Sequence, residues 1–180
     1  MKRIGSYLLL FTICSFSYGQ KFKSVESSIR FYSDAPIENI EATNTEAKSI
    51  VDVDSKSFVF MVPVKEFIFR KRLMQEHFNE NYLESDKYPQ AIFKGKIKNW
   101  NGEKGEFSAT AEGEMSLHGV DKQVSIDGQL NYGDAGMTIT AVFQIKLEDY
   151  KIKIPKAVFY NIAEVVEVTI SFQYQPYEQN

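Results

Sequence analysis

The 180-residue chain has very few of the residues that build disulfides and metal sites, with one cysteine (Cys14) and two histidines. A single cysteine excludes an intrachain disulfide, and so few sulfur and imidazole groups argue against a Cys-rich or multi-histidine metal centre. A basic excess is lacking as well, because 24 Asp and Glu residues outnumber 21 Lys and Arg residues, for a formal charge of −3. We therefore expect no metal site and no binding to nucleic acid by counterion release.

A membrane-spanning run is also lacking at the N-terminus, where an apolar stretch is present but short. It runs from Tyr7 to Phe16, after the basic pair Lys2-Arg3 and before the small residues that end at Gly19. This is far less than the roughly 20 apolar residues of a spanning helix, and the arrangement is typical of a secretory signal peptide. We expect residues 1–19 to be such a signal, with a periplasmic or secreted mature domain of residues 20–180.

What the mature chain has in abundance is strict alternation of apolar and polar residues, the pattern of half-buried antiparallel strands. The runs are long, lie at hairpin spacing and are separated by turn-like connectors such as Asn101-Gly102. Eight to nine such strands fit a closed barrel or a sandwich. The length of the strands favours the barrel, which leaves no exposed edge. The predicted fold is a single all-β domain, an antiparallel up-and-down barrel of about eight strands.

One helical segment is expected, at about residues 70–82. Met74, Phe78 and Tyr82 recur at i, i+4 and i+8 and make one apolar stripe. A helix this short must pack against the barrel to be stable. Phe67 and Phe69, just before it, are expected to form a lid over the barrel interior.

The apolar faces of the strands contain six small residues, Gly95, Ala109, Ala111, Gly113, Gly128 and Ala141. Two interpretations stay open: unfilled volume inside the barrel, or bends in the strands with neighbouring aromatics filling the space. No ionisable residue interrupts these faces, so a cavity would accept hydrocarbon without catalysing a reaction. We expect no catalytic residue and no cofactor. The predicted lining comprises Phe67, Phe69, Phe93, Gly95, Phe107, Ala109, Ala111, Gly113, Met115, Leu117, Ile126, Gly128, Leu130, Ile139, Ala141, Phe143, Ile170 and Phe172.

Two polar features have a structural and a functional interpretation each. His118, before Gly119 in an apparent tight turn, either bonds the local backbone or makes a polar contact at the cavity mouth, and we favour the former. A basic row of Lys94, Lys96 and Lys98 is either the solvated face of a strand or a transient contact with an anionic membrane surface.

Three segments in register resemble the YceI-like family. Residues 73–95 resemble its helix, acidic stretch and Tyr88-Pro89 before a strand. Residues 113–124, with His118-Gly119-Val120, are similar to a hairpin of the family, and residues 143–152 resemble the approach to its closing strand. Residues 77–85 depart from the family's usual pattern after the histidine.

The resemblance implies an exported, lipocalin-like barrel that holds a polyisoprenoid or another long-chain lipid without turnover. The alternative is a solid barrel that acts as a structural, interaction or stress-response module of the cell envelope. Such a module would bind its partner through an outward apolar patch at Val59 and Met61. The partner could be a second copy of the chain, which would make a homodimer. An enzyme ranks last, because the sequence contains no nucleophile motif or phosphate loop.

Overall fold

The computed structural model describes residues 20–34, 39–153 and 163–177, and most of them lie in strands. The predicted signal peptide, residues 1–19, lies outside the described residues. The strands are β1 (Lys21–Ser33), β2 (Ile40–Asn44), β3 (Lys48–Asp52), β4 (Ser57–Pro63), β5 (Ile68–Phe69), β6 (Gln90–Lys98), β7 (Gly105–Leu117), β8 (Val120–Gly133), β9 (Gly136–Lys146) and β10 (Val165–Pro176). The helical elements are η1 (Val64–Glu66), α1 (Arg72–His77), the π-helical turn η2 (Phe78–Tyr82) and η3 (Leu147–Tyr150).

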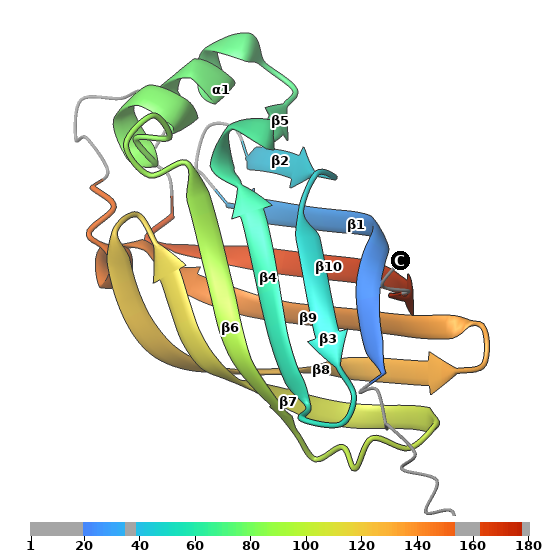
Figure 1. Ribbon diagram of the computed structural model, residues 1–180. Coiled ribbons are helices and arrows are strands. Elements are labelled where there is room, and N and C mark those ends of the chain that lie inside the picture. The colour runs from blue at the N-terminus through green and yellow to red at the C-terminus, as the bar shows by residue number, and fades with distance from the viewer. Residues whose placement is uncertain (1–19, 35–38, 154–162, 178–180) are drawn as a thin grey trace, which may run out of the picture.

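The strands form one antiparallel sheet that closes on itself, as Figure 1 shows. Strands β1, β3, β4 and β6 to β10 follow one another around the barrel, and β10 returns to pair with β1. The closing pair runs for most of both strands, with Ile29 opposite Ile170. The predicted up-and-down barrel of about eight strands is confirmed, because the eight closed strands leave only β2 and β5 outside the ring.

Strand β1 changes partner along its length. Its first residues pair with β3, and its last residues, Ile29–Ser33, pair with β2. A bulge at Ser24/Glu26 in the pairing with β10 lies between the two halves, and bulges bend a strand and increase its twist. β2 and the two-residue β5 therefore extend the wall of the barrel at one end only.

Two glycines let strands β6 and β7 approach very closely. Gly95 lies directly opposite Gly113. A Cβ on Gly95 would lie 2.1 Å from the Glu112 carbonyl oxygen, and one on Gly113 would lie 2.1 Å from the Lys94 carbonyl oxygen. Such distances are closer than any side chain tolerates, so glycine at both positions is what permits the paired strands to approach this closely.

The predicted helix at residues 70–82 is present, but it begins two residues later and changes type. Lys71 is still extended, so α1 starts at Arg72, and the chain continues through the π-helical turn η2. The apolar stripe packs inward as expected, with Phe78 and Tyr82 buried and Met74 half-buried. Figure 1 shows α1 and β5 together at one end of the barrel. The described residues contain no helix long and apolar enough to cross a membrane.

The opposite end of the barrel is filled by aromatic rings. Phe22 and Trp100 both meet the Tyr132 ring edge-on, at 5.3 and 6.0 Å between ring centroids. The Tyr174 hydroxyl donates to Ser49 Oγ at 2.8 Å across the interior, and burial raises the pKa of Tyr174 above its usual range. This end is therefore packed and closed.

Candidate functional site

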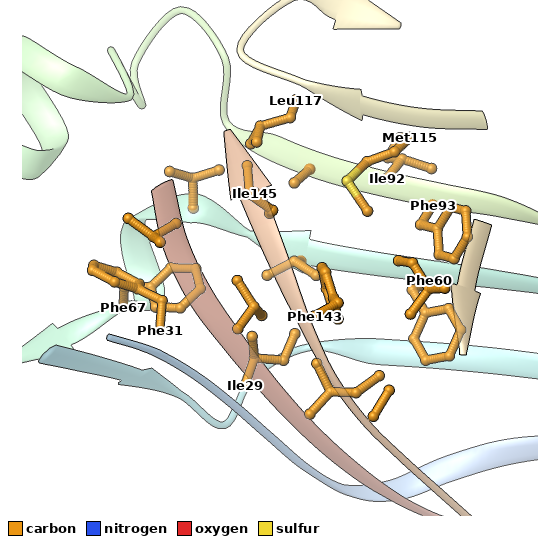
Figure 2. A pocket seen from close by; sticks show the side chains of 18 of the residues that line it. Ile29, Phe31, Phe60, Phe67, Ile92, Phe93, Met115, Leu117, Phe143 and Ile145 are labelled. Carbon is orange, nitrogen blue, oxygen red and sulfur yellow. The ribbon is translucent and has the colours of Figure 1, made fainter. Parts of the chain in front are cut away.

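A cavity of about 250 Å³ lies inside the barrel, between the aromatic end and the helix. Figure 2 shows the rings of Phe31 and Phe67 at one end of the cavity and those of Phe60 and Phe93 toward the other. Every strand of the closed ring except β3 contributes lining residues, and α1 and η2 add more. The volume is close to the lower end of ligand sites, which measure roughly 300 to 1,000 Å³.

Inward-facing residues around the cavity are only partly buried, although they point into a barrel. Ile126, Ile139, Phe143 and Ile170 all line the cavity and keep accessible surface. In a packed core, side chains of this size bury nearly all of their surface. Their remaining exposure is therefore to the cavity, and the interior is hollow.

Fifteen of the eighteen residues predicted to contact a ligand line this cavity. They include the small residues Ala109, Ala111, Gly128 and Ala141. The three alanines leave unfilled volume in the barrel, whereas a Cβ on Gly128 would lie 2.6 Å from the Thr140 carbonyl oxygen, so this glycine permits the close approach of β9. That any of the eighteen contacts a ligand stays a prediction.

Gly95, Phe107 and Gly113 do not line the cavity. The two glycines lie opposite each other in the paired strands β6 and β7, where the backbones themselves fill the space. Phe107 pairs with Leu130 near the aromatic end and packs partly buried against the core. The two glycines are required by the close approach of the paired strands, a role that neither interpretation of the small residues included.

Sequence reasoning missed the contributions of β1, β4 and the helix to the lining. Ile29 and Phe31 come from β1, Phe60 from β4, and Phe78 and Tyr82 from η2. The signal was present in the helical stripe and in the alternation of β4. Neither was assigned to the lining, because a sequence pattern does not distinguish a side chain that faces a core from one that faces a cavity.

The lining is almost entirely apolar. Two titratable side chains reach it from the helical segment, His77 and Tyr82, which the strand patterns alone did not reveal. Burial raises the pKa of Tyr82, so its hydroxyl is uncharged at neutral pH. In the ranges that the structure describes, no cluster of three metal-ligating side chains exists. The arrangement can hold a hydrocarbon and offers little to a charged group.

Four phenylalanines form the lid at the helical end of the cavity. Phe31, Phe67, Phe69 and Phe78 contact one another with ring centroids 4.9 to 5.6 Å apart. All four line the cavity, so they separate it from the outside. The predicted position of Phe67 and Phe69 over the interior agrees with this geometry.

The His118 side chain contacts residues from two segments that are distant in the sequence, one around Glu84 and Tyr88 and the other at Tyr150. Its Nδ1 lies 3.0 Å from the Tyr150 carbonyl oxygen, and its Nε2 lies 2.9 Å from Glu84 Oε2. Both partners are acceptors, so both bonds form together when each ring nitrogen carries a proton. The ring also meets that of Tyr88 edge-on, at 4.7 Å. The predicted bond to the local backbone is wrong, because these partners lie more than 30 positions away in the sequence.

Gly119 explains why a glycine follows this histidine. Its φ is +72°, and a Cβ there would lie 2.5 Å from the Tyr88 ring. The His118-Gly119 turn therefore needs glycine both for its left-handed backbone and for the ring against it.

Two of the three lysines in the basic row on β6 form ion pairs. Lys94 lies 2.9 Å from Glu114, and Lys98 lies 3.9 Å from Glu112, both on β7. These cross-strand pairs favour the solvated-face interpretation of the row. On β4, the side chain of Met61 is 41% exposed, whereas Phe58 and Phe60 are buried inside.

The closed antiparallel barrel around an apolar cavity, with an aromatic lid, defines a class of hollow β-barrel proteins. Within this class, the chain belongs to the YceI-like family, whose domain matches residues 20–174. No curated protein matches the chain.

Solved structures share the fold at low sequence identity. A polyisoprenoid-binding domain from Saccharophagus degradans, implicated in plant cell wall breakdown, has a TM-score of 0.70 and 11% identity, and the match covers 86% of this chain and 98% of that one. BcnA from Burkholderia cenocepacia has a TM-score of 0.65 and 18% identity over 82% and 94% of the two chains. The YceI protein of Campylobacter jejuni has a TM-score of 0.61 and 14% identity over 79% and 88%.

Proposed function

We propose that this protein is a non-enzymatic binding protein that holds the hydrocarbon chain of a polyisoprenoid or another long-chain lipid in its barrel. The observation that carries the proposal is the cavity itself, about 250 Å³ in volume and lined almost entirely by apolar side chains. The polyisoprenoid-binding domain from Saccharophagus degradans, which has the same fold, supports this class of ligand. The sequence features of residues 1–19 support export, so we place the protein in the periplasm or outside the cell.

Burial of hydrocarbon alone supplies the affinity that such a protein needs. Each buried CH₂ contributes about 0.8 kcal/mol in transfer from water, although ligands of drug size retain only about 0.3 kcal/mol per heavy atom. At that efficiency a chain of about 20 carbons binds with about 6 kcal/mol, a Kd on the order of tens of micromolar. Affinity should increase with chain length until the chain no longer fits, so the cavity sets the length that is selected.

The alternative, a structural or interaction module with a solid barrel, does not fit the cavity. The half-exposed residues of the predicted patch, Val59 and Met61, lie on the outer face and are compatible with either function. A catalytic role has no candidate nucleophile or acid–base pair in the lining, where His77 and Tyr82 are the titratable groups.

A fluorescence titration with cis-parinaric acid tests the proposal. The protein is first stripped of lipid, and unlabelled linear and isoprenoid alcohols of increasing chain length then compete with the probe. We expect saturable binding of one probe per chain and competition that improves with length up to a limit. Absence of saturable binding, or competition that does not depend on chain length, contradicts the proposal.

Two neighbouring substitutions on β7 provide a matched pair for this titration. Ala111 lines the cavity, whereas the next residue, Glu112, is exposed on the outer face. Ala111→Leu should weaken probe binding because the larger side chain occupies ligand volume, and Glu112→Gln should leave it unchanged. Equal effects of the two substitutions would place the probe on the surface rather than in the barrel.

A further inference from the structure

Two large apolar side chains remain exposed on the outside of the lid. Ile68 is 61% exposed and Leu73 is 56% exposed, and Ile68 is the most exposed large hydrophobic residue in the described part of the chain. Ile68 stands between Phe67 and Phe69, which both line the cavity. Because strand residues alternate in direction, β5 presents Phe69 to the cavity and Ile68 to the outside.

A run of three basic residues separates the two exposed apolar ones. Arg70, Lys71 and Arg72 are all exposed. Arg72 pairs with Glu76 at 2.8 Å and still keeps 92% of its side chain accessible. Residues 68–73 therefore carry three positive charges and no negative one, in a chain whose formal charge is −3.

Acidic side chains near this run are partly neutralised by their own partners. Glu76 accepts from Arg72, and Asp86 pairs with Lys65. Glu66, before β5, is the remaining acidic residue of the segment from η1 to α1. Residues 64–77 nevertheless contain four Lys and Arg side chains against two Glu side chains, a formal charge of +2 (4 − 2). This positive charge next to an exposed apolar pair matches an anionic bilayer better than it matches water.

The position of this surface matters because it lies outside the lid end of the cavity. A hydrocarbon chain that enters or leaves the barrel by the lid passes the four-phenylalanine cluster, and the outer side of that lid is β5 and the start of α1 (Figure 1). A chain that is delivered from a bilayer avoids crossing water if the lid lies on the bilayer surface.

We propose that Ile68, Leu73 and the Arg70–Arg72 run form a docking surface for anionic phospholipid bilayers. The two apolar side chains enter the headgroup region, and the basic run contacts lipid phosphates. The inference rests on the proposed lipid-binding function and assigns its membrane contact to the lid rather than to the lysine row of β6.

Vesicle sedimentation tests the docking surface. The probes are vesicles of phosphatidylcholine alone and of phosphatidylcholine with phosphatidylglycerol, each at low and at physiological ionic strength. We expect binding to the anionic vesicles that weakens with salt. Arg70→Gln with Lys71→Gln should reduce the partition coefficient about fivefold per charge, so roughly 25-fold together. Ile68→Ser with Leu73→Ser should reduce binding at both salt concentrations.

The matched control removes the same charge elsewhere. Lys96→Gln with Lys98→Gln, on the outer face of β6, should change the partition coefficient little. Equal losses in the control and in the lid variant would overturn the proposal, as would equal binding to neutral and anionic vesicles. A concentration-dependent dimer that the Ile68→Ser/Leu73→Ser variant abolishes in the absence of vesicles, with no vesicle binding by the wild type, would assign the surface to a second copy instead.

Titration with cis-parinaric acid separates this inference from the proposed function. All four lid substitutions lie on exposed side chains outside the cavity lining, so probe affinity should be unchanged in these variants. Intact probe binding without vesicle binding by the wild type would refute the docking surface and leave the lipid-binding function standing. Loss of probe binding in the wild type would refute the function itself.

Discussion

Replacement of Ala111 by leucine tests whether the barrel is hollow. The substitution should increase the free energy of unfolding of a hollow barrel and decrease that of a solid one. Ala111 lies on β7 opposite Ile97 and Ile126 and lines the cavity. Leucine adds three carbons to this position. In an empty cavity, each buries about 0.8 kcal/mol of transfer free energy, for about 2.4 kcal/mol in all.

Ordering the leucine side chain subtracts about 0.5 to 1 kcal/mol, so the lipid-free protein should gain about 1.5 kcal/mol in its free energy of unfolding. For a domain of this size, that gain raises Tm by about 3 to 6 °C. In a solid barrel the same substitution overpacks the core and costs about 1 to 3 kcal/mol.

Thermal unfolding of lipid-free protein, followed by circular dichroism, shows whether the substitution raises or lowers Tm. Ala47→Leu is the control, since Ala47 is 5% exposed and does not line the cavity, and it should lower Tm. A decrease in Tm for Ala111→Leu comparable with that of the control would refute the reasoning that the interior is empty.

Three further predictions concern the lid, the histidine and the closed end. Phe78→Ala should lower the free energy of unfolding by about 3 to 5 kcal/mol and speed probe release in stopped-flow fluorescence, whereas unchanged release would show that the lid does not gate the cavity. His118→Ala should lower the free energy of unfolding by about 1 to 2 kcal/mol in urea unfolding, because the contacts with Glu84 and with the Tyr150 carbonyl oxygen are lost, while the partly exposed Glu84 carboxylate regains water. A loss no larger than that of the exposed substitution Glu112→Gln would contradict this role of His118. The raised pKa of Tyr174 in the fold means that the unfolded chain ionises first, so stability present below about pH 10 should decline as pH rises beyond it. Tyr174→Phe should show a smaller alkaline loss, since burial also raises the pKa of Tyr82 and of Tyr150, and equal loss in both proteins would assign it to other groups.

The strands and the barrel could be predicted from the sequence because their signal is local and long. Alternation over ten or more residues, as in β7 and β8, leaves little choice but half-buried strands. The sequence predicted a closed barrel but not the pairing of β1 with β10, since no local sequence pattern specifies which strands pair when they lie so far apart in the chain. The bulge at Ser24/Glu26 also interrupts the alternation of β1, so the inward positions shift from the even-numbered Phe22 to the odd-numbered Ile29.

The candidate site was only partly predictable, for reasons that particular residues illustrate. Gly95 and Ala111 look alike as small residues on an apolar face, yet the backbone of β7 lies against Gly95 and Ala111 faces empty volume. Which of the two occurs depends on how closely β6 and β7 approach each other, a tertiary property. His118 likewise has a turn-like sequence context, and its partners Glu84 and Tyr150 come within reach only when the barrel and its lid are assembled.

Lipid extraction from protein purified from its native host, followed by mass spectrometry, tests the central claim most directly. The account predicts about one long-chain apolar lipid per protein chain, with a narrow distribution of chain lengths that the Ala111→Leu variant shortens or depletes. Protein that carries no stoichiometric lipid, and whose crystal structure has a fully packed interior, would contradict it.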